Sequence, residues 1–338
     1  MMMMMKNIKS LLTALLCAGA ICMAPLVANA QIVWKLAHKQ PPASPEGRAY
    51  QLFVDEVSRL SNKKMKIDIY PSEQLGAESV SLDMLRKETI HMYLEGLSYA
   101  HVFVPQLNIN TLPFAFRDRD HWSKFMDSPM AKKWKEELAN KSGLSYLGNY
   151  GEFLRGPYRV LISKKPVFKL EDVKGLKLRM YKSEMVMNIW KELGANVILL
   201  AYTETYQGLK TGLVEALTNN LAQSEDGKFQ EVGKYILKTD EFPQSVAFFI
   251  NDKAYRGLPG DLKEVIQKAY TASCEYSQKV IPIEGDKSID RMIQKDKVTF
   301  IRAPMDEFIK KVKPLYRIWE SEEKFGLTKG IIDYIEKL

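Results

Sequence analysis

The sequence has few of the residue combinations with which enzymes carry out catalysis. No GxSxG nucleophile elbow and no GxGxxG or phosphate-binding loop is present. The four histidines do not have the spacing of metal ligands, and no cysteine cluster accompanies them. Adjacent carboxylates, as at residues 136–137, fall on charged helical stretches and are typical of solvated helix faces. We therefore expect no catalytic residue, no cofactor and no metal ion.

Cysteine is also scarce, with three among 338 residues. Two of them, Cys17 and Cys22, fall within the first thirty residues, so the remaining 308 residues hold Cys274 alone. One thiol cannot form an intrachain disulfide, so the stability of this part must come from its hydrophobic core. It contains no second long apolar run, and its length favours two domains.

The first thirty residues are predicted to be a secretory signal peptide. A basic start precedes a largely apolar run at residues 11–27, and Ala-Asn-Ala at 28–30 fits the small-x-small cleavage rule. The apolar run is too short to favour a retained membrane anchor. A lipoprotein is the alternative, but large residues precede Cys17 and Cys22, where acylation needs a small one. We expect cleavage after Ala30 and a location in the periplasm.

Basic residues exceed acidic ones by a small margin. The first thirty residues hold two of the 49 basic residues and none of the 41 acidic ones, so the rest carries a formal net charge of +6. The bases alternate with acids, as in residues 132–137, and no arginine-rich arm is present. Nucleic acid is therefore not an expected partner. A membrane surface, steering of small anions, and a solvated surface without function remain open.

Strand-like and helix-like segments alternate along the chain, which predicts an α/β protein. Strands are expected at residues 32–37, 65–70, 91–95, 144–149, 158–162, 245–250 and 298–301. Helices are expected at residues 45–60, 79–87, 120–141, 262–280 and 305–324. Glycines and prolines near residues 148–157 and at Phe242-Pro243 suit two crossings between lobes.

Residues 172–219 are the most informative segment. Two strand-like pieces alternate with two helical pieces before a last, buried-looking strand; Arg179 ends the first strand, and Asn219 and Asn220 end the last. Ligands of open α/β sheets bind outside the carboxyl ends of strands. A guanidinium there can hold a carboxylate through two parallel hydrogen bonds. The segment predicts a carboxylate ligand on Arg179, whereas the paired amides could instead cap a helix starting near Ser224.

An ordered set of short motifs is similar to one known family. The motifs are DVKGLKLR (172–179), ELGA (192–195), TETYQGLKTGLVEALTNN (203–220), MKIDIYPSEQLG (65–76), TLPFAF (111–116) and EVGKY (231–235). Together they resemble the solute-binding subunit of tripartite ATP-independent periplasmic (TRAP) transporters, of the DctP type. The likeness spans roughly residues 32–250. The family's Asn-Pro is replaced here by Asn219-Asn220, which weakens any transfer of substrate identity.

The resemblance implies a periplasmic-binding-protein-like fold of type II kind, with two α/β lobes, mixed sheets flanked by helices, and a cleft between the lobes. Residues 31–156 with about 245–284 are expected to form lobe I. Residues 157–244 with 285–338 are expected to form lobe II. Such lobes are expected to close on a ligand by hinge motion.

Five residues are implied as ligand contacts: Arg179 and Asn219 on the ligand carboxylate, Arg159 as a second arginine, Tyr202 as an aromatic contact and Glu95 as a polar contact. Arg155, four residues before Arg159, competes for the second basic position. A ligand with a second anionic group should need a second base such as Arg159 or Lys182.

The implied function is capture of a small organic acid and its delivery to the membrane permease subunits of a TRAP transporter, by a monomer. The family's solutes include C4-dicarboxylates, sugar acids, keto acids and aromatic acids, and the sequence does not choose among them. Two alternatives stay open: an exported binding protein that presents its ligand to a sensor or chemoreceptor, and a secreted enzyme on the same scaffold.

Overall fold

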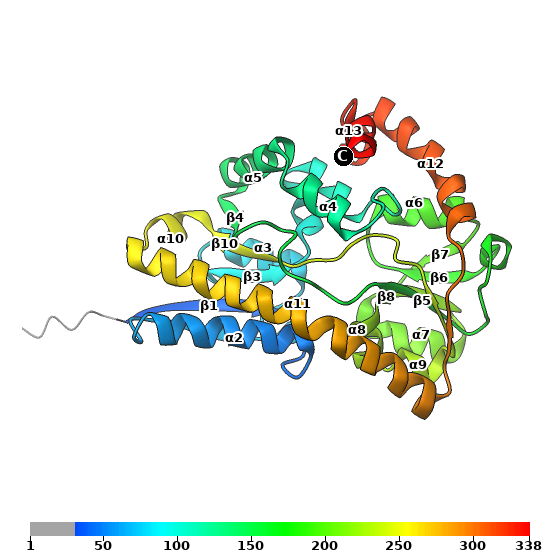
Figure 1. Cartoon of the computed structure of the whole chain (residues 1–338), viewed down its shortest axis with the longest axis horizontal. Coiled ribbons are helices and arrows are strands. Elements are labelled where there is room, and N and C mark those ends of the chain that lie inside the picture. Colours follow the sequence, from blue (N-terminus) through cyan, green and yellow to red (C-terminus); the bar gives the residue numbers. More distant parts are fainter. Residues whose placement is uncertain (1–30) are drawn as a thin grey trace, which may run out of the picture.

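The computed structural model describes residues 31–338. The predicted signal peptide, its cleavage after Ala30, and the lipoprotein alternative at Cys17 and Cys22 lie outside the described residues. Two mixed sheets, each covered by helices on both faces, lie end to end along the molecule (Figure 1). The predicted α/β class and two-lobed architecture are therefore confirmed.

The first sheet has five strands in the order β2-β1-β3-β10-β4. They are β2 (Met65–Tyr70), β1 (Ile32–His38), β3 (Met92–Glu95), β10 (Ala247–Asn251) and β4 (Leu144–Tyr146). β1 is parallel to both neighbours, and β10 is antiparallel to β3 and β4. Its helices are α2 (Pro45–Leu60), α3 (Glu78–Arg86), α4 (Arg119–Met126), α5 (Pro129–Ser142) and α10 (Asp252–Arg256), with 3-10 turns η1 (Leu97–Val102) and η2 (Pro105–Thr111).

The second sheet has six strands in the order β11-β9-β5-β8-β6-β7. They are β11 (Thr299–Ile301), β9 (Tyr235–Lys238), β5 (Arg159–Ser163), β8 (Ala216–Asn220), β6 (Lys177–Met180) and β7 (Asn196–Leu199). β8, β6 and β7 are parallel, whereas β5 is antiparallel to β8 and β9. Its helices are α6 (Glu184–Glu192), α7 (Thr205–Thr211), α8 (Leu221–Asp226) and α9 (Phe229–Val232), with turns η3 (Leu170–Val173) and η4 (Tyr202–Glu204).

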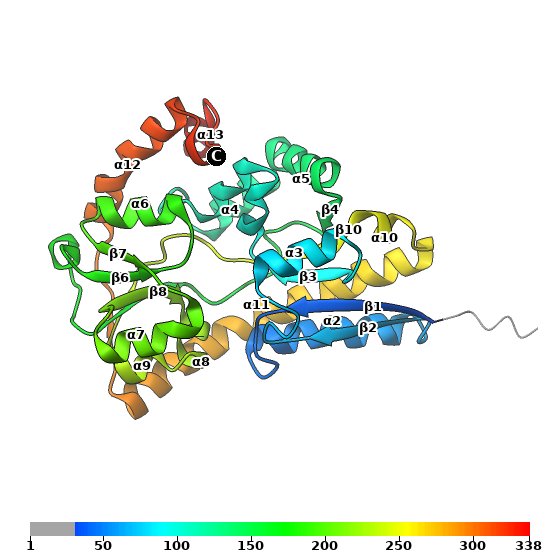
Figure 2. The ribbon, with the colours of Figure 1, turned by 180° about the vertical axis from the view of Figure 1, so that it is seen from behind.

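One long helix, α11 (Gly260–Asp296), runs along both sheets and packs on one face of each (Figures 1 and 2). The sequence predicted a helix that ends at residue 280, which is wrong, because α11 continues through Pro282. A proline removes one helical hydrogen bond but does not end a helix that is packed on both sides of it. Buried Ile281 and Gly285 flank the proline, and a Cβ on Gly285 would come within 2.5 Å of Pro157 in the first crossing segment.

Both crossing segments are held by one half-buried arginine. The guanidinium of Arg119 donates hydrogen bonds to the carbonyls of Gly151 at 2.8 Å and Phe153 at 3.0 Å, in the segment leaving the first sheet. It also donates to the carbonyl of Gln244 at 2.9 Å, in the segment that returns. Burial lowers the pKa of Arg119 to about 10, so it stays charged at neutral pH.

The chain ends in α12 (Asp306–Ser321), η5 (Lys324–Gly326) and α13 (Ile331–Lys337). α12 contacts α6 beside the second sheet, where Lys311 pairs with Glu192 at 2.8 Å. α13 reaches α4 on the first sheet, where the Ile335 carbonyl lies 2.8 Å from Nε2 of His121. The predicted lobe boundaries stay a prediction, and this terminal segment contacts helices on both sides.

Three apolar clusters make up the core. One lies between the first sheet and α2 with α11, and a second lies between the second sheet and α7, α9 and α11. The third covers the other face of both sheets and includes residues of α3, α6, α12 and α13. Among residues 31–338, no helix is long and apolar enough to span a membrane.

Candidate ligand-binding site

The carboxyl ends of strands from both sheets face a cavity of about 790 Å³. β1 and β3 lead to it from the first sheet, and β6 and β8 lead to it from the second, while antiparallel β5 begins there. All five residues predicted as ligand contacts line this cavity: Arg179, Asn219, Arg159, Tyr202 and Glu95. Arg155 and Lys182 line it as well. The structure thus brings the predicted residues together, while their roles as ligand contacts stay predictions.

Arg179 presents the open end of its guanidinium to the cavity. The residue follows Leu178 in β6 and is 5% exposed. Its Nε donates to the carbonyl of Leu200 at 2.9 Å, which fixes the plane of the group. Within residues 31–338, its two terminal nitrogens have no hydrogen-bond partner and no carboxylate pairs with it. Burial lowers the pKa of Arg179, as expected for a cation without an anion beside it.

Asn219 and Asn220 do different things. Asn220 is the N-cap of α8, and its Oδ1 accepts a hydrogen bond from the Gln223 amide at 2.7 Å. The role of helix cap, which the sequence left open for the paired amides, therefore belongs to Asn220 and not to Asn219. Oδ1 of Asn219 accepts from the Asn220 amide at 2.9 Å, and its Nδ2 has no partner among the described residues. Asn219 thus keeps a side-chain donor on the cavity wall, near the Tyr202 hydroxyl.

Arg159 is paired inside the protein. Its Nε donates to Oε1 of Glu241 at 2.6 Å, and Nη2 donates to Oγ1 of Thr218 at 2.8 Å. The guanidinium carbon lies 4.4 Å from the ring centre of Phe242. Burial raises the pKa of the Glu241 carboxyl, and Arg159 opposes that rise. Glu241 is 1% exposed and was not singled out from the sequence.

Glu95, at the end of β3, is also paired inside the protein. It is 1% exposed and forms ion pairs with Arg155 and, at 3.1 Å, with Lys39. Burial raises its pKa, but Arg155 and Lys39 outweigh burial and hold the pKa at about 2. Arg155 therefore faces Glu95, while Arg159 faces Glu241, so the two candidates for the second basic position have different internal partners.

Aromatic rings line much of the remaining wall. Tyr202 is 45% exposed; its ring lies edge-on to Phe229, and its hydroxyl donates to the Gln223 carbonyl at 3.1 Å. The ring centre lies 5.8 Å from the guanidinium carbon of Arg179. Tyr99 and Tyr181 also line the cavity and were missed from the sequence. Tyr181 follows β6 directly, so its position at a strand end could have indicated it.

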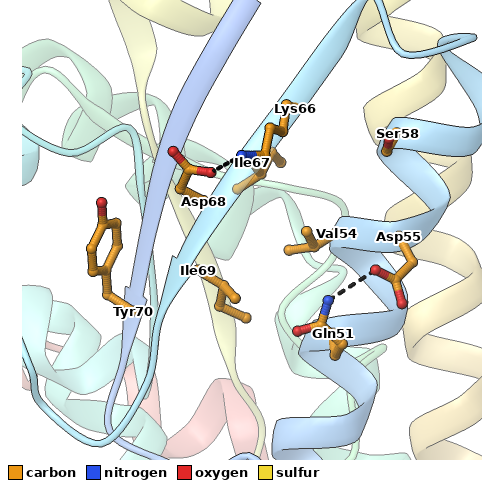
Figure 3. Close-up of a pocket in the computed structure, with 9 residues that line it drawn as sticks. All are labelled: Gln51, Val54, Asp55, Ser58, Lys66, Ile67, Asp68, Ile69 and Tyr70. Carbon is orange, nitrogen blue, oxygen red and sulfur yellow. Dashed lines mark hydrogen bonds and ion pairs between the residues drawn. The ribbon is translucent and has the colours of Figure 1, made fainter.

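A second hollow, of about 430 Å³, lies between α2 and the edge strand β2 (Figure 3). Four of its polar side chains pair with one another: Lys66 pairs with Asp68 at 2.7 Å, and Gln51 donates to Asp55 at 2.8 Å. It contains none of the predicted site residues. The cavity between the two sheets is therefore the candidate site.

Comparison with known proteins gives the same family as the motifs. A family model described as bacterial extracellular solute-binding protein, family 7 (DctP), matches residues 36–322. The chain belongs to this family. It is thus a solute-binding protein of the TRAP type and not an enzyme, so the alternative of a secreted enzyme is set aside.

Relatives of this family 7 protein match over most of their length. A solute-binding protein of Sulfitobacter sp. is 26% identical over 96% of this chain and 97% of its own. The C4-dicarboxylate-binding periplasmic protein DctP of Rhodobacter capsulatus is 25% identical over 84% of this chain and 85% of its own. A TRAP periplasmic solute-binding protein from Ochrobacterium anthropi, solved with bound L-fuconate, superposes with a TM-score of 0.81 at 24% identity, covering 91% of this chain and 99% of that one.

Proposed function

We propose that this protein captures a small organic acid in the cavity between its sheets and delivers it to the membrane permease of a TRAP transporter. The observation that carries the proposal is the guanidinium of Arg179, which is oriented by the Leu200 carbonyl and whose two terminal nitrogens have no hydrogen-bond partner in residues 31–338. Two parallel N–H groups match the two oxygens of a carboxylate. A buried cation without an anion is costly, so a ligand anion would relieve that cost.

The neighbouring groups fit the same ligand. The free Nδ2 of Asn219 would donate to a carboxylate oxygen from the side, and the exposed ring of Tyr202 would cover the ligand. Arg159 and Glu95 would contact the rest of the ligand through hydrogen bonds. Relatives support an acid: one solved structure holds L-fuconate, and another, from Pseudomonas putida F1, holds D-glucuronate. Hinge closure would bring the first-sheet wall against an acid held on Arg179.

A thermal-shift screen of the protein against organic acids tests this capture. An acid present at 100 times its dissociation constant should add about 2.7 kcal/mol to the free energy of unfolding. Arg179→Ala should weaken binding of that acid by about 2–5 kcal/mol, because the carboxylate loses its charged partner. Arg256→Ala is the matched control, since this exposed arginine pairs with Asp252 on α10, outside the cavity wall.

If no acid stabilises the protein, or if Arg179→Ala binds as tightly as the parent, capture through Arg179 is wrong. Delivery needs a separate measurement. Cells that hold the permease subunits should take up the stabilising acid only when this protein is present, and not with Arg179→Ala. Binding without any dependence of uptake on the protein would instead favour presentation of the ligand to a sensor.

A further inference from the structure

The cavity wall carries equal numbers of basic and acidic side chains. The basic ones are Lys39, Arg155, Arg159, Arg179 and Lys182. The acidic ones are Glu73, Glu78, Glu95, Glu204 and Asp226. The wall is therefore not a general attractor of anions, and the pairing of each base decides where a negative charge can bind.

Three of the five bases already have a carboxylate. Glu95 pairs with Arg155 and, at 3.1 Å, with Lys39, which also lies 3.2 Å from Glu78. Glu241, behind the wall, pairs with Arg159 at 2.6 Å. Because Glu95 and Glu241 are each 1% exposed, neither carboxylate can turn into water when a ligand arrives. A ligand anion that took either arginine would leave a buried carboxylate without its partner, which is strongly unfavourable.

The remaining wall charges oppose a second anion. Glu73 and Asp226 form no ion pair within the described part of the chain, and burial, with neighbouring carboxylates second, raises the pKa of each. Lys182 is exposed and keeps its hydration, so it adds little attraction. Arg179 is thus the one buried base of the described cavity wall whose charge has no protein counterpart.

We propose that the site is selective for monocarboxylates, with Glu95 and Glu241 as specificity-determining residues that neutralise Arg155 and Arg159 in advance. This inference rests on the proposed capture of an acid by Arg179. The ligand's single carboxylate binds the Arg179 fork, and its far end meets acceptors such as Glu73 and Glu78, which suit hydroxyl groups. Arg159 keeps hydrogen-bond donors for a neutral ligand oxygen but offers no net charge.

Matched pairs of acids test the selectivity on the unmodified protein. D-Gluconate and D-glucarate differ only at the sixth carbon, which is a hydroxymethyl group in one and a carboxylate in the other; D-galactonate and galactarate form a second pair of the same kind. Titration calorimetry is done at pH 7.5, where the carboxylates of these ligands are ionised. In any pair that binds, the monocarboxylate should bind at least about tenfold more tightly than the dicarboxylate. Equal or tighter binding of the dianion overturns the inference and leaves capture by Arg179 intact. Failure of every acid to bind overturns both.

Two variants test the residues themselves. Glu241→Gln leaves Arg159 without its carboxylate, so the ratio of dianion to monoanion affinity should rise at least about tenfold. Glu136→Gln is the control, because this exposed carboxylate lies on α5, outside the cavity wall. If Glu241→Gln does not fold, Glu95→Gln, which releases Arg155, gives the same comparison. An unchanged affinity ratio in a folded variant, or an equal rise in the ratio for Glu136→Gln, contradicts the assignment.

Discussion

Arg179 and Asn219 project from the same face of two hydrogen-bonded parallel strands. Arg179 of β6 stands in register with Leu217 of β8, and Asn219 follows Leu217 by two residues. Side chains two apart along a strand share a face. Arg159 and Thr218 lie on the opposite face, since Leu161 of β5 is in register with Thr218. The cavity is reached from both faces because it lies at the end of the sheet.

This arrangement predicts different effects for two adjacent amides. Asn219→Ala should weaken binding of the acid by about 1.5–3 kcal/mol, the usual contribution of a hydrogen bond to a charged group. Asn220→Ala should lower the free energy of unfolding by about 0.5–2 kcal/mol, because α8 loses its N-cap. Calorimetric titration and denaturant unfolding of both variants separate the two effects. The prediction is wrong if Asn219→Ala binds the acid as the parent does.

Glu95 should make the protein sensitive to acid. Arg155 and Lys39 outweigh burial and hold its pKa at about 2, below the ordinary 4.5. Because the folded-state pKa is lowered, the carboxylate stabilises the protein above pH 4.5, and this is lost as the pH falls towards 2. The difference between these two pKa values corresponds to about 3 kcal/mol in the free energy of unfolding. Glu95→Gln should therefore be clearly less stable than the parent at pH 7, and the gap between their unfolding free energies should narrow below pH 4.5. A constant gap across that range contradicts the prediction.

Asp226 should have the opposite effect on the pH dependence of stability. Burial, with Glu46 and Glu225 nearby, raises its pKa from 3.8 to about 6. The stability that its neutral form contributes is present below pH 3.8 and is lost as the pH rises through 6. Asp226→Asn should therefore melt at a higher temperature than the parent at pH 7.5, and the difference should shrink towards pH 4. Glu225→Gln should instead melt at a lower temperature than the parent at pH 7.5, because Glu225 pairs with Arg291 at 2.7 Å.

Local patterns predicted much of the fold. The strand at residues 65–70 and the helix at 45–60 match β2 and α2 within their bounds, since alternation and a one-sided apolar face are encoded in neighbouring residues. The helix expected at 120–141 is two helices, α4 and α5. Ser128 accepts from the Ala131 amide as N-cap, with Pro129 in the first helical position. Ser128 and Pro129 are a helix-start signal that can be seen in the sequence. The prediction of one continuous helix gave more weight to the charged residues on both sides of them.

The sequence predicted which residues would line the cavity, but not which of their charges would be paired inside the protein. Strand ends singled out Arg179 and Asn219 as candidates, because position along a strand is a local property. The partner of Arg159 is Glu241, and the partner of Arg155 is Glu95, 82 and 60 residues away in the chain. Such pairs depend on how distant segments fold together, which no local pattern encodes. The sequence therefore left open whether either arginine was available to a second anionic group.

The hydrogen bonds of Arg119 have a consequence for the motion of the two lobes. One rigid, planar group holds the outgoing chain at Gly151 and Phe153 and the returning chain at Gln244, so the two segments are fastened to each other before they reach the second sheet. Neither segment can shift alone without breaking one of these hydrogen bonds. Within these two segments, rotation is thereby confined to the few residues beyond these carbonyls, and the two segments must turn together.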